Sequence, residues 1–447
     1  MGILIMIGQI MLSLMILVIL HELGHFLPSR WFNTRVEKFY LFFDPWFSLY
    51  KKKIGDTEYG IGWLPLGGYV KISGMVDESM DIEQMNSPAQ PWEFRSKPAW
   101  QRLIIMLGGV TVNFILGFLL YAMVLFVWGE KFVPADQVKN GIYADSIGLQ
   151  LGLQDGDKII SIGNQPFNKF NDRLLMKEIV FNNARAIKVE RNDSTIEIPV
   201  KEGTIALLSS SKNSKLPIFG PRIPFVVNDI LKDSPASKTD LKKEDKIIAI
   251  NDTPTPYFND FSRECKKLKF APVRITAIRN QKDTLYILAT TSDQGTLGIF
   301  PKGPDQYFET KRQTYSLGAA IPAGFHKGLG FLGDQFKAFG QMFKGKIKAS
   351  ESLGGFGSIG SMFGNEWIWE RFWTMTAILS LILAVMNLLP IPALDGGYVV
   401  FLLWEIVTRR KPSDKFVEKA VTVGFFLLLA LMVYANGLDI FRKWFQH

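Results

Sequence analysis

The residues best suited to chemistry in this chain are His21, Glu22 and His25, which form the pattern H-E-x-x-H. Side chains four positions apart lie on one face of an α-helix, so the two imidazoles can bind a single metal ion. Glu22 lies one position round the helix and can reach a metal-bound water. Zinc held by three protein ligands keeps an open position for water and lowers its pKa, and a carboxylate can then take the proton. The spacing predicts a hydrolytic site with one Zn²⁺ bound by His21 and His25, and Glu22 as the general base.

This pattern follows an apolar segment. Met1–Leu20 contain no Asp, Glu, Lys or Arg. Ionisable residues at membrane depth are costly and are functional by default. Only four histidines occur in the chain, and two of them, His21 and His25, fall in the pattern. The alternative is that the pattern arose by chance and that its histidines are structural.

The third ligand is predicted to be Asp395. It lies in the stretch Asn387-Leu-Leu-Pro-Ile-Pro-Ala-Leu-Asp-Gly-Gly397, two residues before its end. The prolines and glycines of this stretch interrupt an apolar segment. Asp395 lies 21 residues beyond Thr374, where that segment begins, and His21 follows twenty uncharged residues. In two parallel spans these positions have similar depth. The alternative is a proline-kinked helix in which Asp395 only caps a helix start.

Four apolar segments are long enough to span a bilayer, which takes about 20 residues. They are Gly2–Leu20, Leu103–Trp128, Thr374–Trp404 and Ala420–Leu438. Basic residues gather after the first, before the second and between the third and fourth segments, so these loops are expected to be cytoplasmic and both termini outside. The hydrophobic content of 47% and the charge of +9 favour contact with membrane lipid. No nucleic-acid motif is evident, and the single Cys265 excludes an intrachain disulfide.

Residues 60–74 are punctuated by glycine and predict a β-hairpin with its turn near Pro65–Gly68. The stretch is apolar enough to dip into the membrane, where backbone must be paired or face a cavity. Its strand edge could pair with an extended substrate. The predicted substrate-binding residues are Gly60, Ile61, Gly62, Trp63, Leu64, Tyr69, Val70, Lys71 and Ile72. The alternative is an ordinary surface hairpin.

The region from Glu130 to Phe300 contains an internal repeat. Asp157-Lys-Ile-Ile in the first copy corresponds to Asp245-Lys-Ile-Ile in the second, 88 positions later. The offset predicts two copies of one β-rich fold of about 85 residues. Residues 152–162, Gly-Leu-Gln-Asp-Gly-Asp-Lys-Ile-Ile-Ser-Ile, resemble the PDZ signature, whereas the second copy lacks both glycines.

The predicted fold class is an α-helical membrane protein with four transmembrane helices, a membrane-associated β-hairpin and two β-rich PDZ-like domains inserted between helices 2 and 3. The predicted division is helix 1 with the metal motif at 1–27, a cytoplasmic region with the hairpin and an interfacial helix at 28–102, helix 2 at 103–128, PDZ-like domains at 129–215 and 216–303, an amphipathic membrane-associated linker at 304–373, a broken helix 3 at 374–407, a cytoplasmic loop at 408–419, helix 4 at 420–438 and a tail at 439–447.

These features resemble the site-2 family of intramembrane zinc metalloproteases, and its bacterial RseP group in particular. The resemblance rests on H-E-L-G-H at 21–25, N-x-x-P-x-P-x-L-D-G at 387–396, the four spans and the tandem insert. It implies zinc ligands at His21, His25 and Asp395, a general base at Glu22, and an Asn387 that holds the substrate backbone or the tetrahedral intermediate.

The resemblance also implies substrates and a location. The substrates would be single-pass membrane proteins, namely an anti-sigma factor already cut in the periplasm and remnant signal peptides. The location would be the bacterial inner membrane, with both termini and the PDZ-like domains in the periplasm. Two stretches depart from the family pattern. Gly109…Asn113 resembles G-P-x-x-N with Val110 in place of the proline, and Gly355–Ile359 resembles G-P-I-S-I with Phe356-Gly357 in place of Pro-Ile.

Two other functions stay open. A membrane-anchored zinc enzyme with a cytosolic site would take its third ligand from Glu78, Glu83 or Glu93. A non-catalytic membrane scaffold with PDZ-like domains would retain the metal site as a vestige. The sequence does not indicate an oligomeric state.

Overall fold

The computed structural model describes residues 2–65, 67–75, 88–210, 213, 216–348 and 354–445. The chain divides into two compact units. The first comprises Met1–Gly129, Thr314–Gly333 and Leu353–His447, and the second comprises Glu130–Gln313 and Asp334–Ser352. Every described residue of the predicted site belongs to the first unit.

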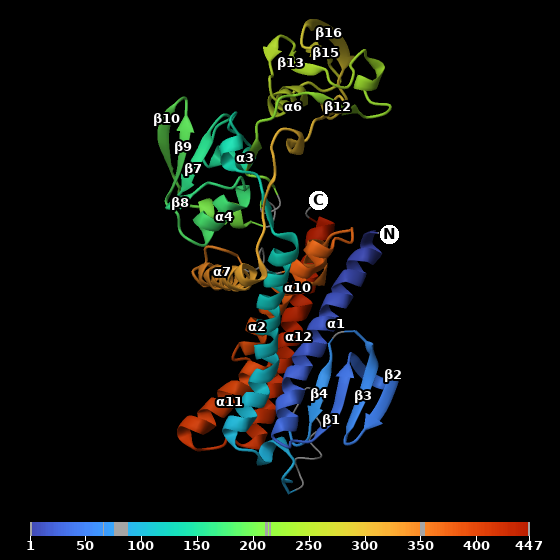
Figure 1. Cartoon of the computed structure of the whole chain (residues 1–447), viewed down its shortest axis with the longest axis vertical. Helices are drawn as coiled ribbons and strands as arrows, with labels where there is room; N and C mark the ends of the chain where they lie inside the picture. The colour runs from blue at the N-terminus through green and yellow to red at the C-terminus, as the bar shows by residue number, and fades with distance from the viewer. Residues whose placement is uncertain are drawn as a thin grey trace. The chain divides into compact units, whose positions relative to one another are not determined.

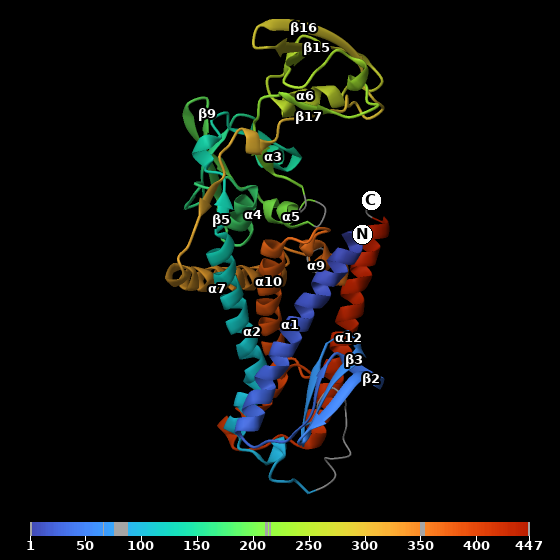
Figure 2. The same cartoon turned by 45° about the vertical axis from the view of Figure 1, so that its right-hand side comes forward.

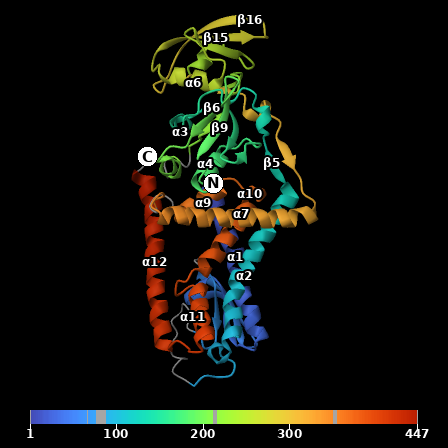
Figure 3. The same cartoon turned by 90° about the vertical axis from the view of Figure 1, so that its left-hand side faces the viewer.

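Among the described residues of the first unit, four helices are long and apolar enough to cross a membrane, which agrees with the predicted number of spans. They are α1 (Gly2–Trp31), α2 (Ala99–Trp128), α10 (Trp369–Leu388) and α12 (Asp414–Phe445). A further helix, α11 (Asp395–Thr408), has 14 residues and is about 21 Å long, too short to span a hydrocarbon core of about 30 Å. It lies along α2 (Figure 3).

The helix α2 forms the centre of this unit and packs on α1, α10 and α11 (Figure 1). The backbones of α1 and α2 approach closely at Gly24 and Gly108, since a Cβ at Gly24 would lie 2.5 Å from the Gly108 carbonyl oxygen. Small residues permit such close helix contacts within a membrane. The α1–α10 contact includes Ser13 and Thr376, whose hydroxyl oxygens lie 3.0 Å apart and are fully buried.

The third apolar segment is interrupted between Leu388, where α10 ends, and Asp395, where α11 begins. Pro390 and Pro392 lack the N–H that a continuous helix requires. Ala393 adopts φ 86°, a left-handed conformation that is unfavourable for a residue with a Cβ. The break places Asp395 at the first position of α11.

A four-stranded sheet lies beside α1 (Figure 2). Its strands are β1 (Val36–Leu41), β2 (Phe43–Ile54), β3 (Thr57–Leu64) and β4 (Tyr69–Ile72), in the order β2-β3-β1-β4. β3 pairs with β1 in parallel, and β4 pairs with β1 antiparallel. The predicted hairpin at 60–74 is therefore wrong, because β1 lies between its two strands. The antiparallel hairpin of this sheet is formed by β2 and β3.

Other predicted boundaries also change. The interfacial helix expected at Pro98–Arg102 is not separate, because these residues are the N-cap and first turn of α2. α1 continues past residue 27, α10 begins before residue 374 and α12 begins before residue 420. The predicted linker contains η5 (Pro304–Gln306), β18 (Lys311–Gln313), α7 (Leu317–Phe343) and α9 (Phe356–Phe363). The division between the two units falls within α7.

The second unit contains two β-rich modules with the same strand order. In the first, β10-β9-β7-β8 form a sheet, and in the second the equivalent order is β16-β15-β13-β14. The first module has β6 (Ile142–Ala144), α3 (Ser146–Gln150), β7 (Lys158–Ile162), β8 (Gln165–Pro166), α4 (Asp172–Val180), β9 (Ala186–Arg191), β10 (Ser194–Pro199), α5 (Thr204–Ser209) and β11 (Phe219–Pro221). The second has β12 (Val227–Ile230), η4 (Ala236–Lys238), β13 (Lys246–Ile250), β14 (Thr253–Pro254), α6 (Phe258–Lys266), β15 (Pro272–Arg279), β16 (Asp283–Thr290) and β17 (Ile299–Pro301).

The repeat extends to individual hydrogen bonds. Asp157 is fully buried and accepts two hydrogen bonds from Arg191, and Asp245 does the same with Arg279. These hydrogen bonds raise the pKa of both guanidinium groups. The predicted boundary at 215/216 is corrected, because β11 pairs with β6 and belongs to the first module. The insert begins with β5 (Glu130–Phe132), which pairs with β18 at its other end.

Candidate metal centre

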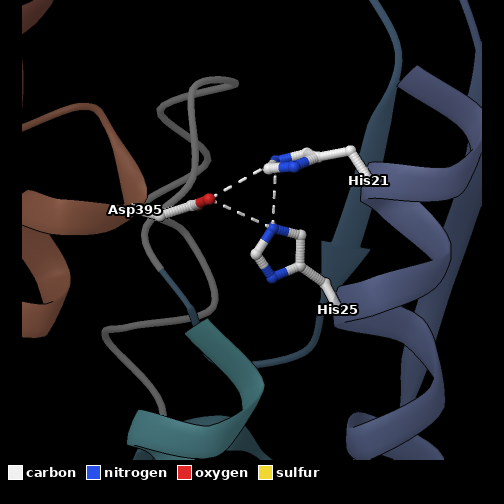
Figure 4. Close-up of side chains that lie close together, drawn as sticks. All are labelled: His21, His25 and Asp395. Carbon is white, nitrogen blue, oxygen red and sulfur yellow. Dashed lines mark hydrogen bonds and ion pairs between the residues drawn. The ribbon is translucent and has the colours of Figure 1, made fainter. Parts of the chain in front are cut away.

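The two imidazoles of H-E-x-x-H and the carboxylate of Asp395 converge (Figure 4). The Oδ2 atom of Asp395 lies 3.3 Å from Nε2 of His21 and 3.4 Å from Nε2 of His25. The two Nε2 atoms lie 3.3 Å apart. His21 and His25 come from consecutive turns of α1, and Asp395 comes from the start of α11.

Hydrogen bonding indicates which atoms are free to bind a metal. The Nδ1 atom of His25 lies 2.8 Å from the carbonyl oxygen of Ile105 on α2. A carbonyl only accepts hydrogen bonds, so Nδ1 carries the proton of a neutral ring and Nε2 presents a lone pair. The Oδ2 atom of Asp395 is buried and has no hydrogen-bond donor among the described residues. With His21 in the same tautomer, the lone pairs of both Nε2 atoms and of Oδ2 converge with no proton between them, an arrangement that a cation would stabilise.

The spacing of these atoms fits zinc. A tetrahedral ion with Zn–N and Zn–O distances of about 2.0–2.2 Å holds its ligand atoms about 3.3–3.6 Å apart. The three separations of 3.3, 3.3 and 3.4 Å fall at the lower end of this range. Two imidazoles and one carboxylate are also a ligand set of catalytic zinc sites, which keep a fourth position open. The residues present thus fit the predicted ion.

The second imidazole is also oriented by α2. The Nδ1 atom of His21 lies 3.1 Å from Nδ2 of Asn113, whose Oδ1 atom is buried and has no hydrogen-bond partner among the described residues. When Nε2 binds a metal, Nδ1 of a neutral ring carries the proton and requires an acceptor. Rotating the Asn113 amide by half a turn exchanges its oxygen and nitrogen without moving any other atom and places Oδ1 at this proton. The α2 helix would then hold both histidines in the ligand tautomer.

Glycine allows α2 to come this close to the histidines. A Cβ at Gly109 would collide with Nε2 of His25 and would lie 2.6 Å from Cε1 of His21. Val110 continues α2 as a regular helix residue and is almost fully buried. The departure from the family's proline therefore leaves the helix unbroken beside the site.

Glu22 lies at the site without joining the ligand cluster. Its carboxylate interacts electrostatically with both histidines and with Asp395, and it accepts a hydrogen bond from the backbone N–H of Val70 on β4. This position suits a base acting on a water beside the ligands. The Val70 contact was not foreseen, because a backbone donor has no signature in the sequence.

Asn387 also reaches the site from the last turn of α10. Its Nδ2 atom lies 3.3 Å from Nε2 of His21, the atom predicted to bind the metal. Its side-chain amide therefore lies beside the ligand cluster. Asp395, at the first position of α11, lies at the positive end of that helix dipole, which stabilises a carboxylate.

The predicted substrate-binding residues separate into two groups. Gly60, Ile61, Gly62, Trp63 and Leu64 belong to β3, whose two neighbours are β2 and β1. An internal strand has no free edge for a further strand. Tyr69, Val70, Lys71 and Ile72 form β4, at an edge of the sheet and in contact with α1. Only the second group can extend the sheet toward the site.

The remaining candidates lie elsewhere or outside the described residues. Glu93 is paired with Arg95 at 2.6 Å, and Glu78 and Glu83 lie outside the described residues. Phe356 and Gly357 form the first turn of α9, where Asp439 and Asn436 of α12 accept hydrogen bonds from backbone N–H groups. Within the described ranges, the one cluster of metal-binding side chains is that of His21, His25 and Asp395.

Comparison with known proteins agrees with this geometry. A sequence model of Peptidase family M50 matches residues 9–431. The chain is 27% identical to a zinc metalloprotease of Neisseria meningitidis, over 96% of this chain and 97% of the relative. It is 26% identical to the Regulator of sigma E protease of Haemophilus influenzae, over 97% of this chain and 98% of the relative. It is also 26% identical to Protease RseP of Yersinia pestis, over 99% of each chain.

Proposed function

Since the chain belongs to peptidase family M50 and is a zinc metalloprotease of the site-2 type, we propose that it cleaves transmembrane segments of single-pass membrane proteins within the bilayer. The observation that supports this most strongly is the convergence of His21, His25 and Asp395 from two apolar parts of the chain. The site lies among helices apolar enough to span a membrane, so a substrate bond must reach it there.

We assign the residues as follows. His21, His25 and Asp395 hold one Zn²⁺, which, when bound, lowers the pKa of a water and polarises a carbonyl. Glu22 accepts the proton of the attacking water and donates it to the leaving amine. Asn387 donates a hydrogen bond to the substrate backbone or to the oxygen that becomes negative. Ile105 and Asn113 hold the imidazoles in the required tautomer.

The substrate must be extended where it is cut. A transmembrane helix satisfies its peptide groups with its own hydrogen bonds, which shield the scissile carbonyl. The free edge of β4 offers replacement partners, and Val70 places that edge beside Glu22. Strand addition at Tyr69–Ile72 would stabilise the unwound segment where the base can act.

The relatives suggest the class of substrate. One is named for regulation of sigma E, which supports a membrane-anchored anti-sigma factor as a substrate, with remnant signal peptides as a second group. We also propose the bacterial inner membrane as the location. By the distribution of basic loops, both termini and the two PDZ-like modules would lie in the periplasm and the metal centre toward the cytoplasmic side.

Replacement of Glu22 by Gln tests the activity. The purified full chain in lipid vesicles would be given a fluorescent transmembrane peptide, and zinc content and cleavage would be measured together. Glu22→Gln should retain the metal and lose at least about 10³-fold in rate, because the amide cannot accept the proton. Glu366→Gln, at an exposed position, is the matched control. Zinc-loaded wild type without any turnover would favour a non-catalytic scaffold.

A further inference from the structure

The edge of the four-stranded sheet opposite β4 is formed by β2 (Figure 1). Both faces of its second half are open, since every residue from Leu49 to Ile54 is exposed. The first half of β2 carries exposed aromatic residues, with Trp46 90% and Phe47 56% accessible. Three consecutive lysines, Lys51, Lys52 and Lys53, follow the aromatic residues.

The charges of this edge are unbalanced. The acidic residues of the sheet are engaged elsewhere: Asp56 pairs with Arg35, Asp44 with Lys38, Glu37 with Lys71, and Glu58 accepts a hydrogen bond from Tyr40. Within the described part of the chain, none of Lys51, Lys52 and Lys53 forms an ion pair. Three ammonium groups thus remain available at adjacent positions.

Contacts with α1 give the depth of the lysines. Lys52 lies opposite Tyr59 in the β2–β3 pairing, and the ring of Tyr59 packs on Phe26 of α1 at 6.2 Å. Phe26 precedes Arg30 by one helical turn, about 6 Å. Arg30 and the end of α1 mark where the apolar part of this helix stops. Along the axis of α1, Lys52 therefore lies close to the point where this helix would leave the membrane.

The opposite end of the sheet lies deeper. A Cβ at Gly68 would lie 2.7 Å from Cγ1 of Val18, which is twelve residues and about 18 Å from Arg30 along α1. Trp46 and Phe47 stack on Trp63 near this end. From Leu64 to Gly60, the partner of Lys51, is about 13 Å along β3. Trp46 and Phe47 lie between the partners Leu64 and Gly62, about 7–13 Å along β3 from the level of Lys51, so the aromatic groups would reach the acyl chains when the lysines lie at the headgroups.

We propose that Lys51, Lys52 and Lys53 bind the phosphate groups of anionic phospholipids, with Trp46 and Phe47 anchored among the acyl chains beside them. This names the class of lipid that contacts the protein and goes beyond the proposed peptidase activity. Neutral lipids would satisfy the aromatic groups but not the three cations.

The alternating side chains favour lipid over a bound peptide. Lys51 and Lys53 point to one face of β2, and Lys52 points to the other. Both faces are exposed, so a fluid headgroup layer surrounding an upright strand can reach all three ammonium groups. A single acidic peptide strand would contact one face.

A hydrogen-bonded network connects β2, the strand proposed to contact lipid, to β4, the strand beside Glu22. Asp44 of β2 accepts hydrogen bonds from Ser48 at 3.1 Å and from Tyr69 of β4 at 2.8 Å. Tyr40 of β1 lies 3.2 Å from Ser48 and donates to Glu58 at 2.7 Å, and burial raises its pKa to about 12, so it stays protonated. Tyr69 precedes Val70, whose N–H faces Glu22. Anchoring β2 in the headgroups would therefore fix the position of β4 along the membrane normal, next to Glu22.

The experiment measures lipid association at this strand directly. Ile54, exposed next to the lysines, is replaced by Cys in a Cys265→Ser background of the full chain and labelled with a fluorophore. The labelled protein is placed in phosphatidylcholine vesicles containing small amounts of nitroxide-labelled phosphatidylglycerol or nitroxide-labelled phosphatidylcholine. Each lysine near an anionic surface strengthens association about fivefold. Quenching by the anionic probe should exceed that by the neutral probe at least fivefold.

Three matched variants determine whether these lysines are responsible. Lys51→Gln/Lys52→Gln/Lys53→Gln should lose the preference, and the triple Arg variant should retain it. Lys266→Gln/Lys267→Gln/Lys269→Gln, the same charge change at exposed positions of the second unit, should also retain it. Equal quenching by both probes in the wild type, or a preference that survives the triple Gln substitution, would overturn the proposal. The proposal would also be overturned if an acidic peptide quenched the fluorophore only when these lysines are present, while the two lipid probes quenched it equally. Quenching by either lipid probe is measured without peptidase activity.

Discussion

The Nδ1 atom of His21 lies 3.1 Å from the side-chain amide of Asn113, 92 positions later in the chain. Together with the Ile105 carbonyl at His25, this contact means that a helix without any metal ligand orients both imidazoles. The metal centre thus requires α2 as well as the two motifs that supply its ligands.

Replacing Asn113 tests that orientation. We expect Asn113→Leu to weaken zinc binding about 10–100-fold, the usual effect of removing a hydrogen-bond partner of a ligating histidine. Competition with a coloured chelator measures the affinity of the purified protein. Thr111→Ala, at an exposed position of the same helix, is the control. Unchanged zinc affinity in Asn113→Leu would show that the amide does not hold His21.

Removing the metal should destabilise the first unit. At free zinc one hundred times its dissociation constant, binding contributes about 2.7 kcal/mol to the folded state. Thermal unfolding with and without a chelator should therefore differ in midpoint for the wild type. His21→Ala and Asp395→Ala should abolish the difference, and His326→Ala, on α7, should preserve it. A zinc-dependent shift that persists in Asp395→Ala would contradict the third ligand.

Proline scanning of β4 separates substrate pairing from sheet stability. The N–H of Val70 points away from β1 toward Glu22, so those of Tyr69 and Lys71 point toward β1. Val70→Pro should fold, since proline is tolerated where an edge strand donates no ladder bond, but should lower kcat/KM by about tenfold or more, because it removes the N–H that faces Glu22 at the edge where a substrate strand would add. Lys71→Pro should instead lower the thermal midpoint. Similar effects of both substitutions would count against strand addition at this edge.

The tandem modules are expected to select substrates by size. They contain no histidine and no predicted ligand, so disrupting them should spare catalysis. Ile247 is fully buried, and a charge there costs several kcal/mol and should unfold the second module. We expect the wild type to reject a substrate that still carries its external domain and Ile247→Asp to cleave it. Thr284→Asp, an exposed control, should behave as wild type. Continued rejection by Ile247→Asp would exclude this role.

Some features followed from the sequence because they depend on local composition. Apolar runs of about 20 residues are sufficient to predict the four spans from the sequence. The prolines at 390 and 392 are sufficient for the break before Asp395. The pairing of His21 and His25 with Asp395 needed only the positions of these residues along apolar segments.

Other features depend on contacts between distant residues. The turn signals at Pro65–Gly68 correctly separate two strands, but local signals do not exclude a third strand between them. The parallel pairing of β1 with β3 provides that strand. Asn113 was recognised only as part of a motif, because its partner lies on another helix. The Ile105 carbonyl and the Val70 N–H are backbone groups, so their residue types give no indication of their roles.

The pairing of β5 with β18 has a consequence for the evolution of this architecture. The insert leaves and rejoins the chain through two neighbouring antiparallel strands, with Glu130 opposite Gln313. Paired residues of this kind have Cα atoms about 5 Å apart, a gap that a short turn can close. Recombination at this ribbon can duplicate, exchange or delete whole modules while every residue of the metal centre stays in place. The tandem repeat is consistent with one such duplication, so the modules can diversify while the metal-centre residues remain constrained.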